Sequence, residues 1–327
     1  MIKKLRRTKI EPKPVPVPEP VVQKQRLSVV TGGAGFIGSN LVDRLLSDGH
    51  EVVVVDDESA TSNVQFYWNK NAQNHIVSIR DMDSISPLFS GVSTVFHLAA
   101  FSRIQIAMNN PRECLETNYI GTYNLLECAR REGVNRFINS STSSSYGLKN
   151  EPPLRESMPT DCLNPYSATK VGAEILCEMY QKLHGLSTVT LRYFNVYGQR
   201  QPLKGTYAPV IGLFEEQKKA NKPCTIVGDG EQRRDFTHVD DVVQANICAM
   251  KARCNGVFNI GTGTNYSVNE IAELVNNPKG TLGIPARPGE ARITLADNTK
   301  AKDMLGWEPT KKLDDYFKKK KKFLWFE

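Results

Sequence analysis

Tyr166 and Lys170 stand four residues apart at the start of a predicted helix, 165–184. Positions i and i+4 share one helix face, so the phenol and the ammonium can address one site. We expect the charge of Lys170 to lower the pKa of the Tyr166 phenol, which makes the phenol a usable base near neutral pH. Because a Tyr-x-x-x-Lys pattern also arises by chance, it needs support from the surrounding sequence.

A run of hydroxyl residues, 140–145, supplies part of that support. It follows a short predicted strand at 136–139, so its side chains are expected just past the end of that strand. A hydroxyl in this run can hydrogen-bond the substrate oxygen that loses its proton. The alternative interpretation of the run is a flexible polar loop.

A glycine-rich turn, residues 31–38, lies between a predicted strand and a predicted helix. Its glycines allow a tight turn, let the backbone approach a pyrophosphate and let the helix pack on the strand, while the helix N-terminus offers N–H groups to phosphates. Asp56 ends the next strand, 24 residues after Gly32. A carboxylate there accepts hydrogen bonds from the adenosine ribose and, together with Asp57, repels a 2′-phosphate, so the pattern indicates NAD rather than NADP. The alternative is an ordinary acidic residue in a turn.

The elements that must position these residues alternate between strand and helix. Strands are predicted at 27–30, 52–55, 75–79, 94–98, 136–139 and 188–192, and helices at about 36–47, 111–132 and 165–184. This alternation predicts an α/β fold, a doubly wound parallel sheet of the Rossmann type. Further helices near 209–220, 239–251, 268–275 and 299–305 predict a second, smaller α/β lobe.

The chain is expected to divide into four parts. They are a disordered, Pro-rich basic arm (1–26), an NAD-binding domain (27–192), a substrate-binding lobe (193–310) and a basic, aromatic tail (311–327). Whether later segments near 225–260 return to the NAD-binding domain stays open. The aromatic end of the tail is expected to pack on the second lobe, and a membrane-surface helix is the alternative.

Composition excludes several classes of protein. The net charge of +7 resides in the two ends, since the body between them carries a net charge of −3, so nucleic acid is not expected as a partner and a weak anionic partner is the alternative. No apolar run approaches the ~20 residues of a membrane span. The seven cysteines contain no Cys-x-x-Cys pair and the histidines are scattered, which disfavours a disulfide scaffold and any metal site and favours a cytoplasmic protein.

Over residues 27–310 the order of motifs resembles that of the extended short-chain dehydrogenase/reductases, in their nucleotide-sugar epimerase/dehydratase group. The motifs are TGGAGFIGSN (31–40), HLAA (97–100), TNYIGT (117–122), NPYSATK (164–170), LRYFNVYG (191–198), GDGEQRRDFTHVDD (228–241), FNIGTG (258–263) and RPGE (287–290). The resemblance implies NAD as cofactor, a UDP-sugar as substrate and a homodimer formed through the helices 111–132 and 165–184.

The resemblance also assigns roles to single residues. Catalysis is assigned to Thr142, Tyr166 and Lys170. Contacts with the cofactor are assigned to Gly32, Gly35, Phe36, Ile37, Gly38, Asp56, Asp57, Ile79, Leu98, Ala99, Ala100, Asn118 (behind the cofactor channel), Ser140, Tyr166, Lys170 and Tyr193. Contacts with the substrate are assigned to Thr142, Asn195, Arg234, Arg287, Glu290 and Thr294. For the arginines, surface ion pairing is the alternative.

Ser143 and Ser144 bear on the reaction, because dehydratases of this group carry Asp and Glu there. Without a carboxylate, elimination of water is hard to catalyse. We therefore expect epimerisation at C4 of a UDP-hexose, UDP-glucose or UDP-galactose, through a transient 4-keto sugar. The alternatives are a 4,6-dehydratase, a UDP-glucuronate decarboxylase and, from another class, a non-catalytic NAD(H)-binding sensor or scaffold.

Thr294 is the residue that bears on which substituent at C2 of the sugar can be accepted. It precedes Leu-Ala-Asp (295–297), where a bulky Tyr in the family excludes N-acetyl groups. A small side chain predicts that UDP-N-acetylglucosamine and UDP-N-acetylgalactosamine are also accepted.

Overall fold

The fold is described from a computed structural model, in which residues 26–60, 63, 65–203, 208–286 and 291–323 are described. The expected Pro-rich arm lies outside the described residues except for Arg26. Two of the predicted substrate contacts, Arg287 and Glu290, lie outside them too, as do the last four residues of the predicted tail.

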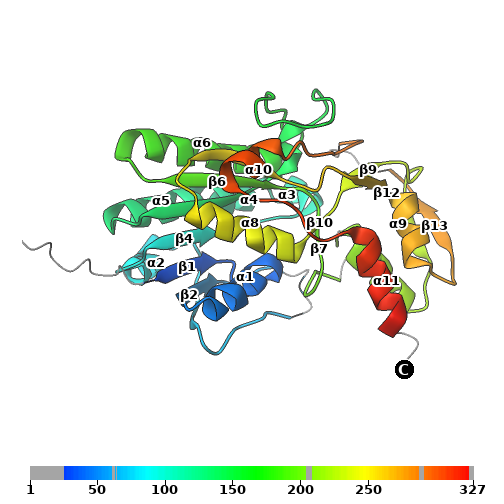
Figure 1. Ribbon diagram of the computed structural model, residues 1–327, viewed down its shortest axis with the longest axis horizontal. Coiled ribbons are helices and arrows are strands. Elements are labelled where there is room, and N and C mark those ends of the chain that lie inside the picture. The colour runs from blue at the N-terminus through cyan, green and yellow to red at the C-terminus, as the bar shows by residue number, and fades with distance from the viewer. Residues whose placement is uncertain (1–25, 61–62, 64, 204–207, 287–290, 324–327) are drawn as a thin grey trace, which may run out of the picture.

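A parallel sheet of seven strands forms the centre of the larger lobe (Figure 1). Its order is β11-β6-β5-β4-β1-β2-β3. The strands are β1 (Leu27–Thr31), β2 (Glu51–Asp56), β3 (Gln73–Ile76), β4 (Thr94–His97), β5 (Arg136–Thr142), β6 (Thr188–Tyr193) and β11 (Gly256–Ile260). The chain proceeds outward from β1 in both directions, so the predicted doubly wound sheet is confirmed. Ligands of such sheets bind at the carboxyl ends of the strands where the order reverses, here between β1 and β4.

Alternate residues of the central strands face opposite sides of the sheet. On one side Val30 packs in a buried cluster with Leu41 of α1 (Phe36–Ser47) and Val242 of α8 (Val239–Lys251). On the other side Val29 packs with Leu126 of α5 (Gly121–Arg131). The strands are therefore apolar on both faces, as a parallel sheet covered by helices requires. The covering helices are α1 (Phe36–Ser47) and α8 (Val239–Lys251) on one face, and α5 (Gly121–Arg131) and α6 (Pro165–His184) on the other.

The predicted helix 111–132 consists of three consecutive segments. It comprises α4 (Pro111–Leu115), a π-helical turn (Glu116–Ile120) and α5. Two shorter helices pack against this face: α2 (Met82–Ile85) contacts α5, and α3 (Ile104–Asn109) contacts α6.

The N-terminus of α6 is fixed by its own sequence. The Asn164 side chain accepts a hydrogen bond from the N–H of Ser167 at 2.8 Å, and Pro165 stands at the first helical position. These are the preferred residues for an N-cap and a first turn. Gly185 ends the helix with a φ of 69°, which suits a glycine C-cap. The start of α6 therefore places Tyr166 and Lys170 in its first two turns.

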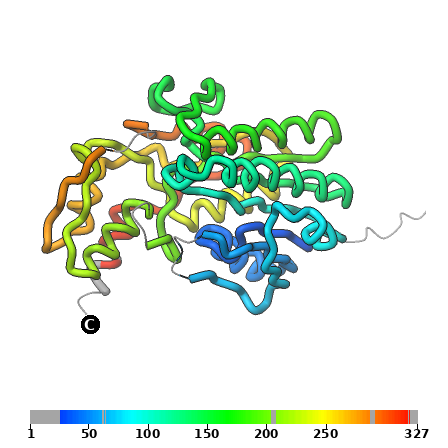
Figure 2. Tube along the Cα trace, turned by 180° about the vertical axis from the view of Figure 1, so that it is seen from behind, coloured from blue at the N-terminus to red at the C-terminus, as the bar shows by residue number. Residues whose placement is uncertain are grey.

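The smaller lobe surrounds a separate apolar cluster, visible at one end of the molecule in Figures 1 and 2. It contains the strand pairs β7 (Val196–Tyr197) with β10 (Thr237–His238), β9 (Arg233–Asp235) with β12 (Asn265–Ser267), and β8 (Cys224–Val227) with β13 (Thr281–Ile284). Its helices are α7 (Val210–Lys219), α9 (Val268–Val275) and α11 (Leu313–Phe323), while α10 (Thr299–Leu305) packs beside β11.

The tail helix α11 packs onto this lobe. Leu313 and Phe317 are buried in its apolar cluster, and the Tyr316 hydroxyl is 3.4 Å from Glu215 of α7. Within the described ranges, no helix has the length and apolar content that a membrane span requires. All seven cysteines are free thiols.

Candidate active site

The glycine-rich turn joins β1 to α1 at the centre of the sheet edge. Gly32 has a φ of +68°, and a Cβ added there would lie 2.7 Å from the backbone nitrogen of Ala99. A Cβ on Gly38 would lie 2.0 Å from the carbonyl oxygen of Gly32. Glycine is therefore required at both positions for the turn to pack this tightly. Gly35 caps α1, and the first residues of that helix, Phe36 and Ile37, line a cavity, so the helix N-terminus is in a position to bind a phosphate.

A cavity of about 500 Å³ runs from this turn toward the start of α6. Its volume falls within the range of small-molecule sites. Fifteen of the sixteen residues predicted to contact the cofactor line it: Gly32, Gly35, Phe36, Ile37, Gly38, Asp56, Asp57, Ile79, Leu98, Ala99, Ala100, Ser140, Tyr166, Lys170 and Tyr193.

The sixteenth, Asn118, is buried behind the cavity wall. Its side chain accepts a hydrogen bond from the N–H of Phe101 at 2.7 Å and donates to the Thr169 hydroxyl at 3.1 Å. Asn118 thus fastens the loop after β4 to α6. Asn118 therefore lies behind the cavity, as the sequence predicted, and holds the lining residues in place without lining the cavity itself.

Asp56 closes the far end of the cavity. Its carboxylate accepts hydrogen bonds from the N–H groups of Ala34 at 3.1 Å and Glu58 at 2.9 Å. Burial raises the pKa of Asp56, and these two hydrogen bonds oppose that rise. The side chain is therefore held in place between the glycine turn and the loop after β2. A fixed carboxylate at this end, with Asp57 beside it, fits ribose hydroxyls and disfavours a phosphate.

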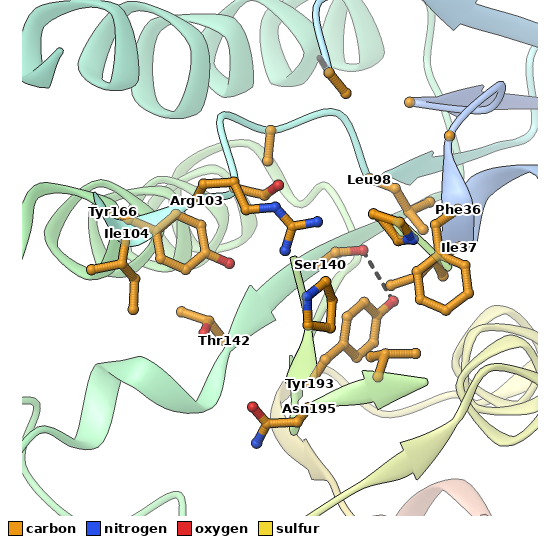
Figure 3. A pocket seen from close by; sticks show the side chains of 18 of the residues that line it. Phe36, Ile37, Leu98, Arg103, Ile104, Ser140, Thr142, Tyr166, Tyr193 and Asn195 are labelled. Atoms are coloured by element: carbon orange, nitrogen blue, oxygen red, sulfur yellow. Dashed lines mark hydrogen bonds between the residues drawn. The ribbon is translucent and has the colours of Figure 1, made fainter. Parts of the chain in front are cut away.

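Thr142 and Tyr166 line the cavity where it reaches the start of α6. Thr142 is the last residue of β5, Tyr166 belongs to the first turn of α6, and Figure 3 shows their side chains close to each other. The Thr142 hydroxyl accepts a hydrogen bond from the N–H of Ser144 at 3.1 Å. Lys170, one turn further along α6, lines the same cavity and is 2% exposed.

The electrostatics of Tyr166 differ in one respect from the sequence-based expectation. Burial raises the pKa of Tyr166, while the nearby Thr142 hydroxyl and the positive charge of Arg103 lower it. The cation that acts on the phenol in this structure is therefore Arg103, where the sequence pattern predicted Lys170. The pKa of Lys170 itself falls to about 8, because the charged ammonium is buried.

A buried ion pair between Glu174 and Arg192 lies next to Lys170 along α6. Glu174 lies one helical turn after Lys170 and accepts two hydrogen bonds from Arg192 of β6, at 3.0 and 2.7 Å. The two side chains are only 7% and 5% exposed. Ser141 of β5 also donates to Glu174. This network ties α6 to β5 and β6, and so fixes the face of α6 that carries Tyr166 and Lys170.

Ser140 and Tyr193 form the floor of the cavity between its two ends. The Ser140 and Tyr193 hydroxyls are 3.0 Å apart, the dashed line in Figure 3, and the Asn246 amide donates to the Tyr193 hydroxyl at 2.8 Å. Burial raises the pKa of Tyr193 to about 12, so this phenol stays protonated at neutral pH.

The predicted substrate contacts divide into three groups. Asn195 and Arg234 line the cavity together with Thr142. Arg234 donates hydrogen bonds to the carbonyl oxygens of Arg233 and Arg292, at 3.0 and 3.1 Å, which orient its guanidinium. Arg287 and Glu290 lie outside the described residues.

Thr294 is not among the described residues that line the cavity. It is 6% exposed, and its hydroxyl accepts a hydrogen bond from the N–H of Asp235 at 3.3 Å. The expected gating of the sugar 2-substituent by this side chain therefore has no support from its position.

The sequence pattern missed Arg103. This residue follows the HLAA motif in the loop after β4 and lines the cavity beside Tyr166. A signal was present, because a basic side chain close to the carboxyl end of a central parallel strand stands where such sheets bind ligands.

Three comparisons identify the family. The family model described as GDP-mannose 4,6 dehydratase matches residues 29–320. A UDP-glucose 4-epimerase of Mycolicibacterium smegmatis is 37% identical over 86% of this chain and 93% of its own length. Relatives also include a UDP-glucuronic acid decarboxylase of Arabidopsis thaliana, 34% identical over 90% of this chain and 68% of that protein.

Solved structures agree with this. The UDP-glucose 4-epimerase of Thermotoga maritima, solved with UDP-glucose, superposes with a TM-score of 0.86 and is 39% identical, over 89% of this chain and 96% of that one. The UDP-glucuronic acid 4-epimerase of Bacillus cereus, solved with UDP-glucuronic acid and NAD, gives a TM-score of 0.81 at 31% identity, over 89% and 96%. With its sheet order, glycine turn and paired Thr142 and Tyr166, the chain belongs to the NAD-dependent epimerase/dehydratase family of the extended short-chain dehydrogenase/reductases.

Proposed function

We propose that the protein is an NAD-dependent UDP-sugar 4-epimerase. The observation that carries the proposal is the set of charged and polar groups around Tyr166. Thr142, Ser143 and Ser144 bring hydroxyls to the part of the cavity near Tyr166, whereas the carboxylates among the described lining residues, Asp56 and Asp57, stand after β2. Proton transfer at a sugar hydroxyl has a base here, but elimination of water lacks the acid that it needs.

The proton follows a short path. Tyr166, once deprotonated, accepts the proton of the sugar 4-hydroxyl, and the Thr142 hydroxyl hydrogen-bonds the same oxygen. NAD held by the turn around Gly32 and by Asp56 would supply the acceptor for the hydride of C4 and the donor that returns it to the other face of that carbon. Tyr166 then returns its proton to the 4-oxygen, so no net oxidation occurs. The positive charge of Arg103 favours the phenolate, and Lys170, which lines the same cavity, is protonated below its pKa of about 8.

Two ends of the cavity support the choice of ligands. Asp56 and the turn around Gly32 suit the ribose and pyrophosphate of NAD. Arg234 offers a guanidinium fork of the kind that recognises a diphosphate, and Asn195 adds an amide beside it. Relatives crystallised with UDP-glucose, or with UDP-glucuronic acid and NAD, bind ligands of these classes. The free cysteines support a cytoplasmic enzyme.

An exposed apolar face supports a homodimer. Ile175, Met179 and Leu183 recur at every fourth residue on α6 and are 61, 38 and 69% exposed. Ile120, the last residue of the π-helical turn, and Tyr123 in the first turn of the neighbouring α5 are 44 and 42% exposed. An apolar area spread over two adjacent helices is typical of a protein interface, and we propose that a second copy of the chain covers it.

Product analysis tests the function. The purified protein is incubated separately with UDP-glucose, UDP-N-acetylglucosamine and UDP-glucuronate, and products are separated by chromatography and weighed by mass spectrometry. A new peak of unchanged mass supports the proposal. A product lighter by water or by carbon dioxide contradicts it, and so does tight NAD binding without turnover of any UDP-sugar.

A further inference from the structure

Two segments far apart in the chain meet on helix α1. One is the segment 67–69, which precedes β3, and the other is 198–202, which follows β7 and which we call the strap. One carboxylate oxygen of Asp43 in α1 accepts a hydrogen bond from the Asn69 amide at 2.7 Å, and the other accepts one from the Arg200 guanidinium at 2.7 Å. Asp43 therefore fastens both segments to the helix that begins at the glycine turn.

The strap is attached at further points. The Arg200 guanidinium lies over the Tyr67 ring, 5.0 Å from its centroid, which joins the two segments directly. The Gln199 amide donates to the Asn40 side-chain oxygen at 2.7 Å, and the Asn40 amide donates to the Gln199 carbonyl oxygen at 3.3 Å. Arg200 has a φ of 64°, which residues other than glycine rarely adopt. Such a conformation persists where surrounding contacts enforce it, so Arg200 is held in one place.

Both segments are joined to the walls of the cavity. The Tyr67 N–H donates to the carbonyl oxygen of Ala34, inside the glycine turn, at 2.8 Å. Pro202 of the strap lines the cavity. So does Phe36, whose carbonyl oxygen accepts a hydrogen bond from the Asn40 amide at 2.8 Å. The strap is therefore attached to the first part of the helix whose N-terminus lines the cavity.

The other end of the strap contacts the smaller lobe. The Gln201 amide donates to the Glu215 carboxylate of α7 at 3.0 Å. A Cβ added to Gly212 of α7 would lie 2.6 Å from the carbonyl oxygen of Pro202, so the strap is packed tightly on that helix. The strap therefore connects α1, which begins at the glycine turn, to α7 in the smaller lobe.

The proposed function sets a requirement that these contacts can meet. In a 4-epimerase the hydride that leaves C4 has to return to the same sugar, and no external oxidant or reductant takes part. If the dinucleotide left between the two transfers, the sugar would remain a ketone. Slow dissociation of the dinucleotide is therefore needed for the chemistry, and segments that close beside a ligand are a usual means of slowing its release.

We propose that Asp43 and Arg200, the clamp pair, are positioning residues that retain the cofactor, because they hold the strap and the segment 67–69 on α1 beside the NAD site. The inference rests on the proposed NAD-dependent function and goes beyond it. Neither residue is among the described residues that line the cavity, so both act through the segments that they hold. The quantity that they control is the rate of NAD release.

Release of NAD from matched variants tests the proposal. The parent, R200M, R200K and D43A are loaded with NAD and diluted into NAD-free buffer, and the nucleotide still bound is quantified by chromatography at successive times. R200M should release NAD about 5- to 10-fold faster than the parent, between the effects of losing an exposed ion pair and a charged hydrogen bond. D43A frees both segments and should release NAD about 10- to 30-fold faster. R200K keeps the charge and should lie between R200M and the parent.

The Arg44–Asp48 ion pair supplies the control. It belongs to the same helix and joins its two atoms at 2.9 Å. Its side chains are 38 and 33% exposed, and those of the clamp pair are 29 and 39% exposed. R44M removes an ion pair of similar exposure that does not hold the strap, so it should release NAD at the parent rate. An equal acceleration in R44M and R200M overturns the inference.

Two further measurements separate cofactor retention from general destabilisation. The double variant D43A/R200M should release NAD no more than about twofold faster than D43A, because Arg200 acts through Asp43. After dilution without NAD, R200M should lose activity sooner than the parent, and added NAD should restore it. Additive effects in the double variant, or a loss of activity that NAD does not restore, overturn the inference.

The outcomes also distinguish this inference from the proposed function. If the parent retains NAD but converts no UDP-sugar, the proposed function fails, and the release rates still decide the role of the clamp pair. If the parent converts a UDP-sugar and both R200M and D43A release NAD at the parent rate, the inference fails and the function stands. A parent that binds no NAD overturns both.

Discussion

The Tyr166 phenol lies beside the Thr142 hydroxyl, which lowers the pKa of the phenol, although one residue ends a strand and the other begins a helix. The phenol thus stands at the carboxyl end of β5, over the cavity that starts at the glycine turn. Tyr166→Phe should therefore lower kcat by about 10³-fold and leave NAD binding and the melting temperature unchanged, within the usual range for loss of a general base. Steady-state kinetics and nucleotide release from denatured protein measure this. Activity close to that of the parent would exclude Tyr166 as the base.

Thr142→Val should lower kcat less than Tyr166→Phe, by about 10- to 100-fold, because it removes the hydroxyl beside the phenol and leaves the base. It should also move the rising limb of the pH–rate profile to higher pH, since the Thr142 hydroxyl lowers the pKa of Tyr166. The sign follows from the role of Tyr166, which must be deprotonated to act. Thr142→Ser is the matched control and should retain the parent profile, whereas a profile unmoved in Thr142→Val contradicts the assignment.

Lys170 makes stability depend on pH. Burial lowers its pKa from 10.5 to about 8 in the folded protein, so between those values the unfolded chain binds more protons and stability rises with pH. At pH 7 the nucleotide-free Lys170→Met variant should be more stable than the parent by up to about 3 kcal/mol, and this difference should shrink between pH 8 and 10.5. Urea unfolding at several pH values tests it. If the stability difference between Lys170→Met and the parent did not change with pH, the pKa of Lys170 would not be lowered by burial.

Replacing only one partner of the buried Glu174–Arg192 ion pair should lower the free energy of unfolding. Glu174→Gln leaves the buried guanidinium without its carboxylate, so we expect a loss of about 3–5 kcal/mol in the free energy of unfolding. The double variant Glu174→Gln/Arg192→Met should recover part of that loss, because no buried charge remains. Urea unfolding of the single and double variants supplies the comparison. Additive losses in the double variant would mean that the two side chains are energetically independent.

Gly38→Ala should abolish NAD retention, because the new methyl group would lie 2.0 Å from the carbonyl oxygen of Gly32 and force the turn apart. A suitable control is Gly283→Ala, where an added Cβ meets no atom within 4 Å. That control should stay within about 0.5 kcal/mol of the parent in stability. Release of nucleotide from the two denatured proteins makes the comparison. Equal retention in both would mean that the turn is not the pyrophosphate site.

The apolar face of α6 should control the oligomeric state. Leu183 is 69% exposed, and Leu183→Asp would place a charge in the proposed dimer interface. We expect the variant to sediment as a monomer at concentrations where the parent sediments as a dimer. Leu148→Asp, at a residue 63% exposed but outside α6, is the control. A parent chain that is itself monomeric would refute the proposed interface.

Strand β5 illustrates a limit of local patterns. The apolar pattern predicted a strand that ends at Asn139, yet β5 continues to Thr142. Ser140 and Thr142 pair in register with Leu191 and Tyr193 of β6, and this pairing extends the strand through hydroxyl residues that favour turns in isolation. Strand β11 shows the same limit, because its pairing with β6 joins segments more than sixty residues apart.

The sequence by itself determined the alternation of strands and helices, the bounds of α6, α8, α9 and α10, and the glycine turn with Asp56. These features depend on hydrophobic periodicity, helix caps and backbone conformation, which act between residues close in the chain. Only the tertiary structure decided that Arg103 lies near Tyr166 and that Thr294 is buried without lining the cavity. Both outcomes depend on which loops meet at the edge of the sheet and on which side chains that meeting buries, and no short stretch of sequence encodes such contacts.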